Sequence, residues 1–85
     1  MALFVIERNF ADQLDPDALD YASIKLVNDD AGVRWLYSFL SADKKKTYCL
    51  YEAPSPDEII AAARRANVPV DSVVEVSRFS PDTLR

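Results

Sequence analysis

Residues 33–54 read VRWLYSFLSADKKKTYCLYEAP, and this stretch decides the fold. Two apolar, aromatic-rich runs flank a polar tip at residues 41–46, which predicts a β-hairpin. Successive side chains of a strand alternate, so both faces of the first run are expected to be apolar. The aromatic residues Trp35, Tyr37 and Phe39 are expected on one face, and the aliphatic residues Leu36 and Leu40 on the other. A sheet wetted on one side does not need both sets. The hairpin therefore predicts a sheet covered by helices on one face and by something else, such as a second copy of the chain, on the other.

The pairing register of the hairpin decides which side chains of the second run join the three aromatic residues of the first. An odd number of unpaired residues at the tip places Cys49 and Tyr51 with them. An even number places Tyr48, Leu50 and Glu52 there instead. The sequence leaves both registers open.

The length and the cysteine count favour a small domain that gains stability by self-association. The chain has 85 residues, and a domain of this size buries only about 60% of the surface of its unfolded chain. Residues 1–79 are expected to form one domain and residues 80–85 a tail. The single cysteine, Cys49, has no partner for an internal disulfide, and the absence of histidine excludes a structural zinc shell of nitrogen and sulfur ligands. A homodimer is the natural source of additional buried area, and one unpaired cysteine fits a reducing, cytoplasmic location.

The charge balance argues against nucleic acid as a partner. The formal net charge is −4, and the only basic run, KKK at residues 44–46, falls at the predicted hairpin tip, where a solvated turn explains it. The N-terminal apolar run is ended by Glu7 and has no basic segment before it, so neither a signal peptide nor a membrane span is expected.

The segment between the first strand and the hairpin is expected to contain a helix. Residues 3–8 (LFVIER) predict a strand. In the LDPD motif at residues 14–17, Asp15 is expected to cap a helix, with Pro16 at its first position and Leu14 packed against Leu19. The helix is expected to run to about residue 27. The residues expected to be buried are Leu19, Ala22 and Leu26, with Ile24 or Val27 widening the stripe.

A second helix and a last strand come after the hairpin. Ser55 and Glu58 flank Pro56 in the pattern of a capping box. An alanine-rich helix is expected through residue 66, ended by the NVP motif, and residues 70–79 (VDSVVEVSRF) predict the final strand.

The predicted element order is strand, helix, strand, strand, helix, strand. This order is typical of the α+β, ferredoxin-like fold, with a four-stranded antiparallel sheet and both helices on one face. The strands at residues 3–8 and 70–79 are also apolar on both sides, which predicts an exposed apolar sheet face. Two such faces packed together would give an isologous dimer of the dimeric α/β barrel type.

Three segments resemble a known family, the domain-of-unknown-function 4242 family. They are the hairpin, the opening FVIERNF at residues 4–10, and the run AARRANVPVDSVVEV at residues 62–76. The CLYEAP string at residues 49–54 and the ARRA motif before Pro69 are the most specific parts. The best-characterised members of the family are nickel-binding or nickel-responsive proteins. The resemblance implies a ferredoxin-like fold that dimerises through its sheets, and it makes nickel the named candidate ligand.

The chain departs from the metal-binding members of that family at one position. Those members commonly carry a histidine in the second helix just before the Ala-Arg-Arg run, whereas this chain has Ala62 there and no histidine anywhere. Nickel favours imidazole, thiolate or a tetragonal set of nitrogen and oxygen ligands. A nickel site here would have only carboxylates, carbonyl oxygens and Cys49.

The candidate site residues are acids and aromatics of the strands. Carboxylates at Glu7, Glu52 and Glu75 within strands would have raised pKa values inside a closed dimer interior, or would form strand-end ion pairs. The arginines available for such pairs are Arg8, Arg34 and Arg78. The aromatic residues could line a pocket for a flat ligand, with tyrosine hydroxyls as polar anchors, or form core and interface. Cys49 in an apolar strand is expected to be a small core residue.

The function expected from these patterns is a small cytoplasmic homodimer that binds a small molecule or divalent metal at or near the dimer cleft. The candidate ligand-binding residues are Glu7, Trp35, Tyr37, Cys49, Tyr51 and Glu52. One alternative is a cofactor-free enzyme of the dimeric α+β barrel type, a monooxygenase, isomerase or cyclase with tyrosine or glutamate as acid–base groups. The other is an interaction module without a ligand.

Overall fold

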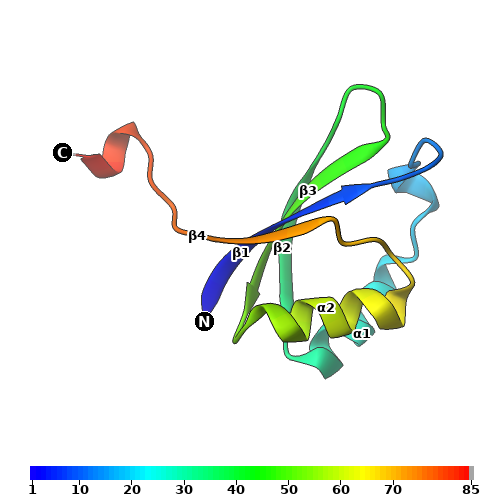
Figure 1. Ribbon diagram of the computed structural model, residues 1–85, viewed down its shortest axis with the longest axis horizontal. Coiled ribbons are helices and arrows are strands. Elements are labelled where there is room, and N and C mark those ends of the chain that lie inside the picture. The colour runs from blue at the N-terminus through cyan, green and yellow to red at the C-terminus, as the bar shows by residue number, and fades with distance from the viewer. Residues whose placement is uncertain (85) are drawn as a thin grey trace.

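The sheet has the strand order β2-β3-β1-β4, and all three neighbouring pairs are antiparallel. Its strands are β1 (Ala2–Asn9), β2 (Arg34–Leu40), β3 (Lys46–Ala53) and β4 (Ser72–Val76). The computed structural model describes residues 1–84. Within them, α1 (Tyr21–Ala31) and α2 (Pro56–Ala66) lie side by side against one face of the sheet (Figure 1). The predicted α+β, ferredoxin-like fold is confirmed.

The first helix begins later than predicted. Asp15 caps only a single 3₁₀ turn, η1 (Pro16–Ala18), because Leu19 adopts an extended conformation with ψ 141° that breaks the helical path. Asp20 is the true N-cap of α1, and its carboxylate accepts a hydrogen bond of 3.2 Å from the backbone N–H of Ser23. The predicted start at Asp15 is therefore wrong, and Leu19 lies outside the helix.

The inward face of α1 also differs from the prediction. Leu26 is 70% exposed and Ala22 is exposed. The helix instead faces the sheet with the residues that were predicted only to widen the buried stripe, Ile24 and Val27, and Asn28 is buried among them. The half-buried members of this stripe are Ile24, Val27 and Ala31. Two β-branched side chains lie on this stripe, and packing against the sheet selects it over the smaller Ala22 face.

Gly32 ends α1 in the left-handed conformation, with φ 76°, and its N–H donates to the carbonyl oxygens of Asn28 and Asp29. We expect Gly32→Ala to lower the free energy of unfolding by about 1 kcal/mol, because an L side chain is strained at this φ although the space around it is open. Urea denaturation followed by circular dichroism measures the change. Gly32→Asn is the matched control and should lose clearly less, since asparagine tolerates this conformation; equal losses would contradict the assignment to backbone strain.

The second helix begins and ends at the predicted residues. Ser55 is its N-cap, Pro56 is its first residue, and Ile59, Ala62 and Ala63 are buried. The capping box is only half formed, because the Ser55 hydroxyl donates to the Glu58 carboxylate rather than accepting from the backbone.

The hydrogen bond from Ser55 lowers the pKa of the Glu58 carboxyl below its ordinary value of 4.5. A depressed folded-state pKa gives a contribution to stability that is present above the ordinary value and is lost as the pH falls through the folded value. We expect Ser55→Ala to raise the Glu58 pKa, measured by NMR titration of its side-chain carbonyl carbon. Ser55→Thr keeps a hydroxyl and should leave the pKa low; an unchanged pKa in Ser55→Ala would contradict this contact.

The hairpin is confirmed, but its two runs do not share faces in either predicted way. Trp35 pairs with Tyr51 and Tyr37 pairs with Leu50, so Leu36 is an extra residue in a β-bulge. The bulge interrupts the alternation, and Trp35 faces the helices while Tyr37 and Phe39 face away from them. The prediction that the three aromatic residues share one face is therefore wrong, and each predicted register describes one half of the hairpin.

The last strand is shorter than predicted. β4 ends at Val76, which pairs with Leu3, and β1 offers no partner beyond Ala2. After Val76 the chain leaves the sheet and continues into the short η2 (Pro81–Leu84), which lies away from the sheet (Figure 1). At the other end of β4 the chain is fixed to β1, because Asp71 donates its N–H to the Glu7 carbonyl oxygen at 2.9 Å.

The two faces of the sheet have different surroundings. The core lies between the sheet and the helices, with Phe4, Ile6 and Ile59 at 1% exposure or less. No helix of residues 1–84 covers the other face, which we call the open sheet face. Its apolar residues are Leu3, Val5, Tyr37, Phe39, Tyr48, Leu50, Val74 and Val76. Phe39 is 65% exposed and Val74 is 54% exposed, whereas Leu50 in the middle of this face is only 9% exposed. The predicted apolar face is confirmed, and its outer residues are the exposed ones.

Candidate ligand-binding pocket

A pocket of about 340 Å³, which we call the inner pocket, lies between the sheet, the two helices and the loop at residues 10–20. α2 contributes one isoleucine and three alanines to the wall of the inner pocket. They are Ile59, Ala62, Ala63 and Ala66. Alanine side chains end at Cβ, so they cannot fill the space between α2 and the strands. The alanine-rich face predicted to lie close on the sheet instead leaves a cavity.

The loop at residues 10–20 closes one side of the inner pocket with Leu14, Pro16 and Leu19. This loop is fixed to the hairpin tip through its backbone. The N–H of Phe10 donates to the Lys45 carbonyl oxygen at 2.8 Å, and the N–H of Leu14 donates to the Lys44 carbonyl oxygen at 2.7 Å. The tip is therefore a support for the pocket wall as well as a solvated turn.

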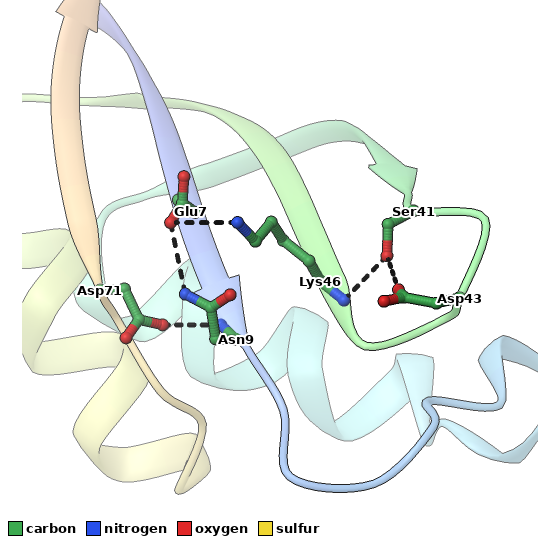
Figure 2. Close-up of polar contacts among 6 residues, drawn as sticks. All are labelled: Glu7, Asn9, Ser41, Asp43, Lys46 and Asp71. Atoms are coloured by element: carbon green, nitrogen blue, oxygen red, sulfur yellow. Dashed lines mark hydrogen bonds and ion pairs between the residues drawn. The ribbon is translucent and has the colours of Figure 1, made fainter.

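The hairpin tip is itself held by side-chain contacts (Figure 2). The Ser41 hydroxyl donates to the Asp43 carboxylate at 2.6 Å and accepts from the backbone N–H of Lys46 at 3.0 Å. The Asp43 carboxylate also accepts from the Lys45 N–H at 3.0 Å. The hydrogen bond from the Ser41 hydroxyl, and to a smaller extent the one from the Lys45 N–H, lower the pKa of the Asp43 carboxyl.

An arginine and a tyrosine supply the polar centre of the inner pocket. Arg8 is only 5% exposed, its Nη1 donates to the Pro69 carbonyl oxygen at 2.7 Å, and its guanidinium lies 5.9 Å from the centre of the Tyr51 ring. Burial raises the pKa of the Tyr51 hydroxyl above 10.0, although the charge of Arg8 and hydrogen bonds from Arg8 and Asn28 act in the opposite direction. Tyr51 is thus a neutral hydroxyl at physiological pH and can donate a hydrogen bond.

An aromatic pair and a small sulfur-containing side chain complete the wall. Trp35 stacks on Tyr21 of α1, with ring centres 5.8 Å apart and planes 15° apart, and its indole N–H donates to the Ser38 hydroxyl at 2.7 Å. Cys49 is buried and its thiol lies 3.6 Å from the Thr47 hydroxyl. Trp35, Cys49 and Tyr51, all candidate residues from the sequence, therefore line one pocket.

The other candidate residues lie on the opposite face of the sheet. The Glu7 carboxylate lies 3.7 Å from the Lys46 ammonium and accepts from the Asn9 amide at 3.3 Å (Figure 2). The Glu52 carboxylate lies 3.5 Å from the Arg34 guanidinium. Tyr37 is 48% exposed on the open sheet face. The sheet thus separates Tyr51 from Glu7, Glu52 and Tyr37, so Tyr51 does not meet the other acid–base groups of the enzyme hypothesis within one protomer.

Sequence reasoning missed two of the polar residues that line the pocket, Arg8 and Asn28. The alternation of β1 contains a signal for the first, because Phe4, Ile6 and Arg8 must share a face. Asn28 lies on the helical stripe of Ile24, which the sequence predicts as a possible extension of the buried face. No comparable pattern in the sequence indicates that the loop at residues 10–20 forms part of the pocket wall.

The donor set in residues 1–84 does not fit a nickel centre. No group of three or more histidine, cysteine, aspartate or glutamate residues comes together there. Cys49 lies in the inner pocket, where no carboxylate lines the wall. Within the same residues, neither helix has the length and hydropathy required to cross a lipid bilayer.

Comparisons with known proteins agree with this fold. The crystal structure of SCO4226 from Streptomyces coelicolor A3(2) matches with a TM-score of 0.79 and 22% sequence identity, over 93% of this chain and 100% of that chain. At this identity the match shows a shared fold. No individually curated protein matches the chain. A family model described as "Nickel responsive protein SCO4226-like" matches residues 4–76. This match confirms the resemblance to nickel-responsive proteins but does not test the name domain-of-unknown-function 4242. The chain belongs to the SCO4226-like family of nickel responsive proteins.

Proposed function

We propose that this chain is a small cytoplasmic protein that binds an apolar small molecule in the inner pocket and self-associates through the open sheet face. The observation that supports the binding role is the pocket itself, an apolar cavity of about 340 Å³ with a few convergent polar groups. Such cavities are the usual form of small-molecule sites in proteins. The proposed ligand site thus lies between sheet and helices, in place of the dimer cleft expected from the sequence.

The arrangement of side chains on the open sheet face supports a dimer. An apolar row crosses the whole sheet from β2 to β4. Each of its residues pairs with the next on the neighbouring strand, in the order Tyr37, Leu50, Val5 and Val74. The charged pairs of Glu7 with Lys46 and Arg34 with Glu52 lie on opposite sides of this row. An apolar centre with a polar rim is the anatomy of a protein interface, and two sheets can pack face to face. We expect sedimentation equilibrium at micromolar concentration to give a dimer mass; a monomer would contradict this part of the proposal.

Nickel is not proposed as the ligand of this chain, because the described residues offer no matching donor set. Isothermal titration with nickel chloride at neutral pH is therefore expected to show no saturable heat. Saturable binding of one or more ions per chain would show that donors from two protomers combine, and it would overturn this assignment.

The binding role can be tested with a neutral probe, naphthalene-2-carboxamide. We expect saturable binding by calorimetry and a shift of the indole N–H resonance of Trp35, which is the only tryptophan of the chain and lines the pocket. Ala63→Leu adds three carbon atoms to the pocket wall and should weaken binding by about tenfold or more.

Ala61→Leu is the matched control, because Ala61 is exposed on the same helix. It should leave the affinity unchanged. Binding that is equally weakened by both variants, or that leaves the Trp35 resonance unmoved, would place the probe elsewhere and overturn the proposal.

A further inference from the structure

Arg8 is the one charged residue among those that line the inner pocket in the described part of the chain. The chain carries 14 acidic residues against 10 basic ones, yet none of the acids contributes to this wall. The only formal charge on the described pocket wall is therefore positive, although the chain carries a net charge of −4.

The guanidinium of Arg8 has no carboxylate partner within residues 1–84. The ion pairs of these residues use Lys25, Arg34, Lys46 and Arg65, and none of them involves Arg8. Its hydrogen bonds go to neutral acceptors, the Pro69 carbonyl oxygen at 2.7 Å and the Tyr51 hydroxyl. A guanidinium has five N–H donors, and a buried charge without a counter-charge is costly. The charge of Arg8 is thus left to be balanced by something that enters the pocket.

The neighbours of Arg8 suit an anion as well. The Tyr51 hydroxyl stays protonated and can donate, and the buried Asn28 side chain carries an amide N–H₂ group. Both residues line the pocket with Arg8. A planar guanidinium beside two neutral donors is the arrangement that binds a carboxylate through several hydrogen bonds.

The remaining walls determine the rest of the ligand. They consist of the alanines of α2, the leucines of the loop at residues 10–20 and the stacked Trp35–Tyr21 pair. Flat aromatic rings pack well against such walls, and about 340 Å³ limits the ligand to one or two rings. We propose that the inner pocket binds a small aromatic carboxylate, with its carboxylate on Arg8 and its ring between α2 and Trp35. This inference rests on the proposed function, since it names the chemical class of the ligand.

The test compares naphthalene-2-carboxylate with naphthalene-2-carboxamide, two probes of nearly equal shape that differ in charge. In the wild-type protein at pH 7 we expect the carboxylate to bind at least about tenfold more tightly, as is usual for a hydrogen bond to a charged group. Equal affinities would overturn the assignment of a carboxylate but leave the proposed function standing. Absence of binding by both probes would overturn the proposed function itself.

Arg8→Gln should weaken binding of the carboxylate far more than binding of the carboxamide, so that the ratio of the two affinities falls to about one. Arg64→Gln is the matched control, because Arg64 is exposed on α2 and its loss changes the net charge equally. It should preserve the ratio of the two affinities; loss of the ratio in this control would attribute the preference to net charge and overturn the proposal. Arg8→Lys keeps the charge and should retain a preference of intermediate size, which provides a folded variant if Arg8→Gln does not fold.

Discussion

Replacing Phe4 by alanine is expected to lower the free energy of unfolding by about 4 kcal/mol. Phe4 is 1% exposed, lies on the central strand β1 and pairs with Tyr51. Its ring belongs to the same core cluster as Ile59 of α2, so its loss leaves a cavity between sheet and helix. Domains of this kind have a total stability of about 5–15 kcal/mol. Urea denaturation followed by circular dichroism should show unfolding at a much lower urea concentration than in the wild-type protein.

Phe39→Ala is the matched control, since the same side chain is removed from the opposite face of the sheet. Phe39 is 65% exposed, and its loss should cost less than about 1 kcal/mol in protein diluted below the range of self-association. Similar losses for both variants would contradict the division of the sheet into a covered and an open face.

Val74→Glu is expected to weaken self-association by about 100-fold or more. Val74 ends the apolar row of the open sheet face, and it is exposed enough, at 54%, for the isolated protomer to accept a charge there. In an isologous dimer each substitution occurs twice, and a carboxylate buried without a partner costs several kcal/mol. Sedimentation equilibrium over a range of concentrations measures the change.

Leu26→Glu provides the control for this variant, because Leu26 is 70% exposed on α1, on the covered side of the sheet. It should leave the association constant unchanged. A dimer that persists in Val74→Glu but dissociates in Leu26→Glu would place the interface on the helices and contradict the proposed assembly.

The sequence was sufficient for the element order and for the apolar character of both sheet faces, because these depend on local periodicity. It failed at Leu36, where one extra residue in β2 changes which aromatic side chains share a face. A bulge of this type leaves no periodic trace, since the WLYSF run alternates regularly as written. The start of the first helix failed for a related reason. Asp15 and Pro16 are good helix-starting residues, but only the backbone of Leu19 determines that the turn stops after η1.

The candidate site was predicted in part. Trp35, Cys49 and Tyr51 meet in the inner pocket, whereas Glu7, Tyr37 and Glu52 lie beyond the sheet. The division between them depends on register, which the sequence left open. The sequence suggests for Arg8 only a role as ion-pair partner of strand glutamates, although the alternation from Phe4 places it inside. Whether a carboxylate lies close enough to pair with Arg8 depends on the tertiary structure, so the sequence could not show that Arg8 forms no ion pair within residues 1–84.

The strand β3 separates the pocket from the open face, and its residues serve the two in turn. Thr47, Cys49 and Tyr51 face the pocket, and Tyr48 and Leu50 face the other way. On the proposed function, odd positions of this strand serve ligand binding and even positions serve assembly, although they are adjacent in the sequence. Substitutions one codon apart would then change ligand preference and assembly independently.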